Sequence, residues 1–233
     1  MGAVLVFVGI GVIAAVAVYL SYYFKKKRQE GFGLVARQLG FQFSIQDPFE
    51  TVSEPFKLFQ KGDGRGVENV LWGNWQATDI REFDYWYYDE STDSNGHRSK
   101  TYHHFSCVMA PVRAACSPLT IEHENVLTRL ADHLAMHDIE FESEDFNKAF
   151  DVKSIDKKFA SDFIDARMMQ WLLQHAAGFS FEVVADRVLV SCKRLQPTEI
   201  VPLVGTAKGF VDEVPNVVYS LYPKNAPQQA GSA

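Results

Sequence analysis

Charge is missing from one long stretch near the start of the chain. Residues 3–24 (AVLVFVGIGVIAAVAVYLSYYF) contain no Asp, Glu, Lys or Arg, although charged residues make up 22% of the 233-residue sequence. A helix of ~22 residues at 1.5 Å per residue spans the ~30 Å hydrocarbon core of a bilayer. The stretch therefore predicts a transmembrane helix within residues 1–24, with residues 3–24 in the lipid bilayer. The alternative is a buried helix of a soluble domain, which rarely stays uncharged for this length.

Cations are also missing before this run, and this excludes an ordinary secretory signal peptide, whose positive charge precedes a shorter apolar core. Four cations follow the run instead, namely Lys25, Lys26, Lys27 and Arg28. By the positive-inside rule we expect a single-pass protein of the cell membrane, with its N-terminus outside and its C-terminal body in the cytoplasm. The same four side chains are expected to anchor the chain at anionic headgroups.

Cysteine is scarce and net positive charge is absent. Cys107, Cys116 and Cys192 lie far apart without a C-x-x-C pair, which is typical of reduced thiols rather than of a zinc site or a disulfide framework. The formal net charge is −6, and the body alone is near about −10 once the four cations are set aside. Phosphate backbones repel such a body, so nucleic acid is not expected as a partner.

Complete catalytic motifs are absent too. The glycines of KGDGRG form neither a Walker loop nor a Rossmann fingerprint, and they predict a tight turn before a strand. No G-x-S-x-G elbow surrounds any serine. His133 and His137 lie four residues apart near the end of a helix expected at 124–136, a spacing that can hold zinc. Leu134 stands where a metalloprotease has its Glu base, so the two histidines are weak metal candidates and no cofactor is expected.

What is abundant is extended, aromatic-rich sequence broken by turns. Such runs occur in groups, with helical patterns inserted between them and after them, and this predicts an α+β fold with a mostly antiparallel sheet behind one transmembrane helix. We divide the chain into a transmembrane helix (1–24), a basic stop and linker helix (25–40), a cytosolic α+β domain (41–222) and a flexible tail (223–233).

Two segments of the domain carry further predictions. Asp156 can cap a helix, and the apolar spacing after it predicts one long helix that ends at Gly178. The segment FSFEVVADRVLVS is expected to form two strands, with Ala185 and Asp186 at the turn.

The strongest functional feature is a predicted aromatic hairpin, Phe83–Phe105, with Asn95 and Gly96 at its tip. Aromatic side chains there exceed what one buried strand face needs, and such an excess is typical of a binding surface, unless a sheet buried on both faces absorbs it. Asp84 could also meet His103 or His104 across the hairpin, but alternation allows only one of them to do so. The candidate binding residues are Trp72, Trp75, Asp84, Tyr85, Trp86, Tyr87, His103 and His104.

A resemblance adds to this reading. The stretch FESEDFNKAFDVKSIDKKFASDFIDARMMQWLL resembles a family of uncharacterised, mainly bacterial membrane-anchored proteins that share a domain of unknown function. The resemblance implies a fold and a membrane location, and it implies no activity. The residues that carry it are Phe141, Glu142, Ser143, Phe146, Asn147, Phe150, Val152, Asp156, Phe159, Ala160, Arg167, Met168, Met169 and Leu172.

We therefore expect a single-pass membrane protein whose cytosolic domain is a binding or adaptor module, with the aromatic hairpin in contact with a protein partner. The alternative is a membrane-tethered enzyme, such as a metal-dependent hydrolase, that uses Asp84, His103 or His104 and the pair His133 and His137.

Overall fold

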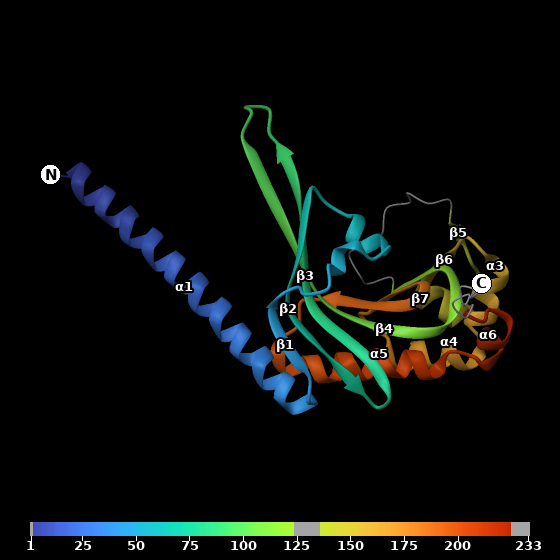
Figure 1. Ribbon diagram of the computed structural model, residues 1–233. Helices are drawn as coiled ribbons and strands as arrows, with labels where there is room; N and C mark the ends of the chain where they lie inside the picture. Colours follow the sequence, from blue (N-terminus) through green and yellow to red (C-terminus); the bar gives the residue numbers. More distant parts are fainter. Residues whose placement is uncertain (1, 124–135, 225–233) are drawn as a thin grey trace, which may run out of the picture.

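The computed structural model describes residues 2–123 and 136–224, without the side chains of residues 2–6, 8 and 10. Its first element is one continuous helix, α1 (Gly2–Leu39), which includes both the expected span and the expected linker helix. Figure 1 shows this helix projecting from the body, with only its C-terminal turns against the sheet. Phe32, Val35, Ala36 and Leu39 are buried there, and their spacing puts them on one face of the helix.

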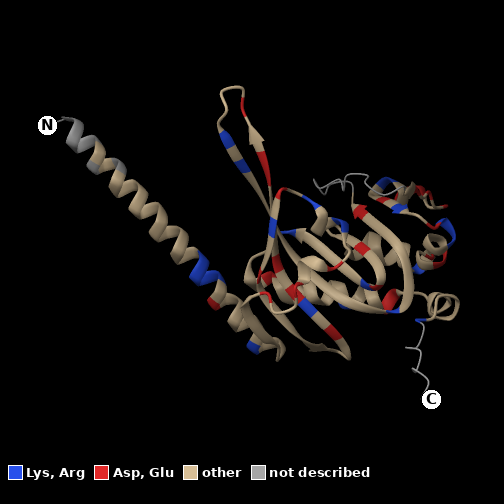
Figure 2. Cartoon of the chain, turned by 45° about the horizontal axis from the view of Figure 1, so that its top comes forward, with Lys and Arg blue, Asp and Glu red and all other residues tan. Residues whose placement is uncertain are grey.

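The remainder of α1 is exposed. Figure 2 shows the cations of residues 25–28 as a blue band between the uncharged N-terminal part and the docked turns. On the N-terminal side of this band, apolar side chains face solvent, for example Val12 at 57% exposure and Tyr22 at 66%. In the part of the chain that the structure describes, no helix has the length and apolar character needed to cross a membrane. The transmembrane span at residues 3–24 therefore stays a prediction.

The body is built on a seven-stranded sheet in which every described pairing is antiparallel. The strand order is β1-β2-β3-β4-β6-β5, and β7 also pairs with β4. Long strands of β-branched and aromatic residues suit a sheet that is buried on both faces. The strands are β1 (Gln42–Gln46), β2 (Gly64–Trp75), β3 (Thr78–Thr92), β4 (Arg98–His123), β5 (His137–Asp138), β6 (Phe150–Ser154) and β7 (Ser180–Lys193).

Strand β7 differs from its prediction. Residues 180–193 form one strand that pairs with β4 along its length, and not two strands joined by a turn. Ala185 has a left-handed backbone (φ 54°) and lies where the register shifts. This is a β-bulge, which has the same local signature as a turn but lets the strand continue.

The predicted long helix after Asp156 is also divided. The first part ends at Phe163, and Asp165 caps a second helix by accepting a hydrogen bond from the Met168 N–H at 2.8 Å. A second capping carboxylate in the middle of the run starts the new helix. The helices after α1 are α2 (Glu144–Ala149), α3 (Lys157–Phe163), α4 (Ala166–His175), α5 (Ile200–Glu213) and α6 (Asn216–Leu221), with short 3-10 helices η1 (Thr51–Ser53), η2 (Lys57–Gln60) and η3 (Pro197–Glu199).

Both faces of the sheet are covered, as Figure 1 shows. The end of α1 and helices α3 to α6 pack on one face, which we call the helix face, around residues such as Phe181 and Phe210. Helix η2 covers the opposite face, which we call the η2 face, where Phe56 and Phe59 pack against Tyr85. The prediction of an α+β fold with a mostly antiparallel sheet is confirmed.

Candidate functional site

A buried ion pair joins α1 to the sheet. Arg28 donates from Nε and Nη2 to the two oxygens of Asp84, at 2.6 and 2.5 Å, and from Nη1 to the carbonyl of Leu195 at 2.7 Å. The side chains of Arg28 and Asp84 are 12% and 3% exposed. A bidentate pair of this kind fixes both the distance and the orientation of its two elements.

Two more donors complete this junction. Asn69 donates from Nδ2 to Asp84 at 2.8 Å, and Arg194 approaches the same carboxylate at 3.3 Å. Asn69 has a positive φ of 56° at a bulge in β2, which turns its side chain toward the carboxylate. We call Arg28, Asn69, Asp84 and Arg194 the helix–sheet junction. The sequence analysis identified Asp84 but missed Asn69 and Arg194, because neither belongs to a local motif.

Glu82 lies next to the junction on the same face of β3. It is fully buried, and neither of its carboxylate oxygens has a hydrogen-bond partner among the described residues. Burial raises the pKa of Glu82 well above its ordinary value, and the nearby Asp84 raises it further while Arg28 opposes the shift. The arrangement therefore favours the neutral acid at Glu82.

Asp84 does not form the pair with an imidazole that the sequence suggested. Its cross-strand partner is Ser106, whereas His103 lies on the opposite face and hydrogen-bonds Asp89 at 3.0 Å. His104 is on the same face as Asp84, but the donors to that carboxylate are those of the junction. Burial, and next the charge of Arg194, lower the pKa of His104.

The four basic residues after the apolar run have different roles. Arg28 is a buried structural residue of the junction, and Lys25 forms an ion pair with Glu68 at 3.0 Å. Lys26 and Lys27 have exposed side chains. Of the four predicted anchoring cations, Arg28 therefore has a structural role that sequence spacing did not indicate.

The hairpin of β3 and β4 projects beyond the body, as Figure 1 shows, and we call residues 85–105 the arm. Its η2 face carries Tyr85, Tyr87, His103 and Phe105. Tyr85 is fully buried and donates from its hydroxyl to the Leu58 carbonyl at 3.0 Å, and the ring of Tyr87 stacks on His103 at 4.6 Å. Tyr85, Tyr87 and Phe105 are buried, which agrees with a packing role.

The other face of the arm carries Trp86, Tyr88, Tyr102 and His104, which we call the outer aromatic face. The rings of Trp86 and Tyr88 are parallel at 6.3 Å, and Tyr102 lies within 5.3 Å of Tyr88. Tyr102 is 52% exposed. This face is the solvent-accessible aromatic surface of the hairpin, and Tyr102 belongs to it although the sequence analysis did not include it.

Glycines in β2 make room for this aromatic face. A Cβ at Gly64 would lie 2.4 Å from the ring of Tyr88, and a Cβ at Gly66 would lie 2.7 Å from the ring of Trp86. The rings therefore rest directly on the backbone of the neighbouring strand. Gly62 lies in a bend with a positive φ of 72°, and β2 begins at Gly64. The sequence analysis missed the packing role of the glycines.

Two of the three tryptophans of the predicted surface, Trp72 and Trp75, lie apart from the arm. Trp72 is on the η2 face, where its ring meets Phe49 edge to face at 5.2 Å. Trp75 is at the end of β2 and packs against the core of the helix face. The structure thus divides the predicted aromatic set among three places.

A groove of about 870 Å³ lies between α1 and the sheet at the junction. Lys25, Lys27, Arg28 and Arg194 line it, together with Glu68 and Gln196. The groove is therefore lined by basic residues next to the end of the apolar run of α1, although the body as a whole is acidic.

Of the two predicted metal candidates, only His137 belongs to the described residues. His133, with the helix expected at 124–136, lies outside the described residues, and His137 is exposed in β5. Within residues 2–123 and 136–224 no group of three or more His, Cys, Asp or Glu residues is placed to hold a metal ion. Cys107, Cys116 and Cys192 are free thiols in the core.

Comparison with known proteins gives a likeness at the level of the fold. No protein-family model matches the chain, and no curated protein matches it. The fold is similar to the crystal structure of the mycobacterial trehalose monomycolate transport factor A, TtfA, with a TM-score of 0.60 and 11% sequence identity over 87% of this chain and 98% of that chain. At this identity the likeness shows that the two chains share a fold.

Proposed function

We propose that this protein is a single-pass membrane protein whose cytosolic α+β domain is a binding or adaptor module. Residues 3–24 would cross the bilayer with the N-terminus outside, and the outer aromatic face of the arm would bind a protein partner. The family resemblance of residues 141–172 agrees with a membrane location. TtfA is named as a transport factor, which is compatible with a binding role here.

The exposed part of α1 supports the membrane location. Large apolar side chains along it face solvent, among them Phe7 at 74%, Ile13 at 70% and Val18 at 71% exposure. Apolar surface of this extent is unfavourable in water and requires a cover. The cations at Lys26 and Lys27 follow this surface and are free to meet anionic headgroups.

The observation that carries the binding role is the outer aromatic face. Trp86, Tyr88 and Tyr102 form a contiguous ring cluster on a projecting hairpin, and they are only partly covered. Tyr and Trp residues are enriched in protein interfaces because they add large contact area with few rotatable bonds. Figure 1 shows the arm and the exposed part of α1 leaving the body on the same side, so a partner at the membrane could reach both.

Photo-crosslinking in the native membrane tests this proposal. A benzoylphenylalanine that replaces Tyr102 should give one discrete adduct, whereas the same residue in place of Val217, which is 43% exposed on α6, should not. Trp86→Ala combined with Tyr88→Ala should remove the adduct without unfolding the body. Equal adducts from both positions, or none from Tyr102, would contradict the proposed surface.

The described residues that the enzyme alternative names give it no support. Asp84 is saturated by the junction, and His103 forms a half-exposed pair with Asp89 on the other face. His123 lines one cavity beside β6 together with carboxylates such as Asp138 and Asp151, but no Ser or Cys is among the described residues that line it. We therefore propose the binding role alone.

A further inference from the structure

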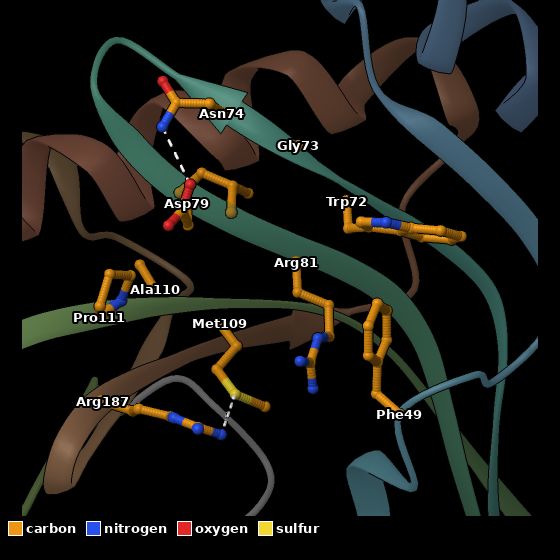
Figure 3. A pocket seen from close by; sticks show the side chains of 11 residues that line it. Phe49, Trp72, Gly73, Asn74, Asp79, Arg81, Met109, Ala110, Pro111 and Arg187 are labelled. Carbon is orange, nitrogen blue, oxygen red and sulfur yellow. Dashed lines mark hydrogen bonds between the residues drawn. The ribbon is translucent and has the colours of Figure 1, made fainter.

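A second cavity, of about 380 Å³, lies on the η2 face of the sheet, away from the arm and the junction. Its floor is a row of residues that are cross-strand neighbours, Trp72 on β2, Arg81 on β3 and Met109 on β4. Arg187 on β7 and Phe49, which precedes η1, complete the walls. Figure 3 shows these side chains around the cavity.

Arg81 is a cation without an acceptor among the described residues. Its guanidinium lies over the ring of Phe49 at 3.9 Å, and no described residue accepts a hydrogen bond from it. Its Nη1 atom is buried and unpaired. Burial lowers the pKa of Arg81, and only the charge of Asp47 opposes that shift. A guanidinium nitrogen that has lost water without gaining an acceptor is an unusual and costly arrangement.

The nearby carboxylates already have partners. Asp47 accepts hydrogen bonds from the Phe49 and Thr51 N–H groups at 3.0 and 2.6 Å. Glu54 forms an ion pair with Arg187. Asp79, at the far end of the cavity, accepts from Asn74 at 2.9 Å. None of these acids forms an ion pair with Arg81 in the described structure.

A second cation points toward the same space. Figure 3 shows the guanidinium groups of Arg81 and Arg187 turned toward each other, with the sulfur of Met109 between them. Arg187 contacts this sulfur at 3.9 Å. Arg187 is also paired with Glu54 and, at 3.6 Å, with Asp186. Of the two cations that face the cavity, Arg81 is therefore the one without a counter-charge in the described structure, and an anion between the two guanidinium groups would supply it.

We propose that this cavity binds a small organic acid, in which a carboxylate or phosphate group meets Arg81 and Arg187 and an apolar body lies along Phe49 and Trp72. Guanidinium groups bind carboxylate and phosphate oxygens through paired N–H donors. The rings of Phe49 and Trp72 meet edge to face at 5.2 Å and form an apolar corner of the cavity. The cavity volume is within the range of small-molecule sites.

Calorimetric titration of the full chain in a nonionic detergent tests the proposal with three probes of similar shape: 1-naphthoate, 1-naphthyl phosphate and the uncharged 1-naphthamide. We expect both acids to bind, and the amide to bind at least about tenfold more weakly because it cannot form a charge-assisted bond to arginine. The stronger of the two acids identifies the head group. Inorganic phosphate alone should bind more weakly than naphthyl phosphate, since it lacks the apolar body.

Variants locate the binding. Arg81→Gln should weaken both acids at least about tenfold, and Arg113→Gln, a matched change at an exposed arginine of β4, should not. Binding of the amide as tight as that of the acids, no binding of either acid, or an equal loss in both variants would overturn the proposal. The comparison of acids with amide uses the unaltered chain, so it decides the question even if Arg81→Gln fails to fold.

Discussion

Asp84 is a carboxylate in the middle of an aromatic strand, and its burial is tolerated because three side chains donate to it. Taking a carboxylate out of water costs several kcal/mol, which good hydrogen-bond geometry offsets. The partner that contributes most comes from α1, 56 residues earlier in the chain. At the residue scale, therefore, a buried ion pair adds to the apolar contacts that attach the long helix to the body.

Arg28→Met should destabilise the body by about 3–5 kcal/mol, because it leaves Asp84 buried without its bidentate partner. Lys26→Met, a matched change at an exposed position two residues earlier, should alter stability by less than about 0.5 kcal/mol. Chemical denaturation of both variants in the same detergent measures the difference. Similar stabilities of the two variants would show that the ion pair contributes little to the fold.

Glu182 predicts how stability depends on pH. It accepts hydrogen bonds from the Lys57 and Leu58 N–H groups, but burial dominates and raises its pKa to about 7. The native state therefore holds this proton to a higher pH than the unfolded chain does, where a glutamate has a pKa near about 4.3. The contribution of Glu182 to the free energy of unfolding is therefore fully present below the pKa of the unfolded chain. It is lost as pH rises through the native pKa of about 7.

Between pH 4.5 and 8, the free energy of unfolding of the wild type should fall by up to about 3 kcal/mol because of Glu182 alone. Glu182→Gln should flatten that part of the profile, whereas Glu144→Gln, at an exposed carboxylate of α2, should leave it unchanged. Denaturation midpoints across this pH range provide the test. An unaltered slope in Glu182→Gln would place the titrating group elsewhere.

At the scale of elements, the shape of the arm depends on aromatic rings that pack against glycine backbone in the neighbouring strand. Strand β2 offers Gly64 and Gly66 to the rings of Tyr88 and Trp86, so the outer aromatic face lies flat on its neighbour. A side chain at either glycine would push a ring outward. The shape of the proposed binding surface is thus set partly by a strand that contributes no aromatic residue to it.

Gly66→Ala should therefore displace Trp86 and destabilise the protein by about 1–3 kcal/mol. Gly33→Ala is a useful control, because a Cβ there meets nothing within 4 Å and alanine is favoured over glycine inside a helix by up to about 1 kcal/mol. Fluorine NMR of 5-fluorotryptophan-labelled protein should show a shifted Trp86 signal only in Gly66→Ala. An unchanged Trp86 signal would mean that the ring does not rest on this backbone.

For the whole molecule, the decisive feature is that one end of helix α1 packs in the body while the other end is exposed. The C-terminal turns of α1 are buried in the core, and the apolar turns before Lys25 are exposed. Since α1 is continuous, anything that holds its N-terminal part also sets the position of the arm. This arrangement suits an adaptor at a membrane.

The double variant Val12→Glu and Val16→Glu should release the protein from membranes, because each charge at the centre of a span costs about 2.5–3.5 kcal/mol. Both positions are more than half exposed, at 57% and 51%, so unfolding of the body should not change. The comparison variant carries Val217→Glu and Leu221→Glu on α6. Extraction with alkaline carbonate separates the two, and equal retention would contradict a span at residues 3–24.

Much of the architecture could be predicted from local patterns, and the errors have a common origin. Turn and cap signals indicated the hairpin tip at Asn95 and the helix start at Asp156, because such signals depend on a few adjacent residues. The same reasoning made Ala185 a turn, although it is a bulge. A bulge and a turn share a backbone conformation, and only the pairing partner β4 distinguishes them.

The site was less predictable than the fold. The sequence singled out the aromatic hairpin, and alternation correctly placed His103 and His104 on opposite faces. It could not show that Tyr85 and Tyr87 are buried beneath η2 while Tyr88 and Tyr102 are partly or largely exposed. Burial depends on which segments cover each face, and η2 reaches the arm from outside the hairpin.

By itself the sequence determined the uncharged run of residues 3–24, the cations after it, the acidic body and the antiparallel sheet, because composition and short periodicity are properties of the chain alone. Only the tertiary structure decided that Arg28 belongs to a buried junction with Asp84, and that Arg81 and Arg187 share a cavity. These residues are separated by 56 positions in the first pair and by more than 100 in the second. Their contacts arise from the pairing of distant strands and the docking of α1, which no local pattern encodes.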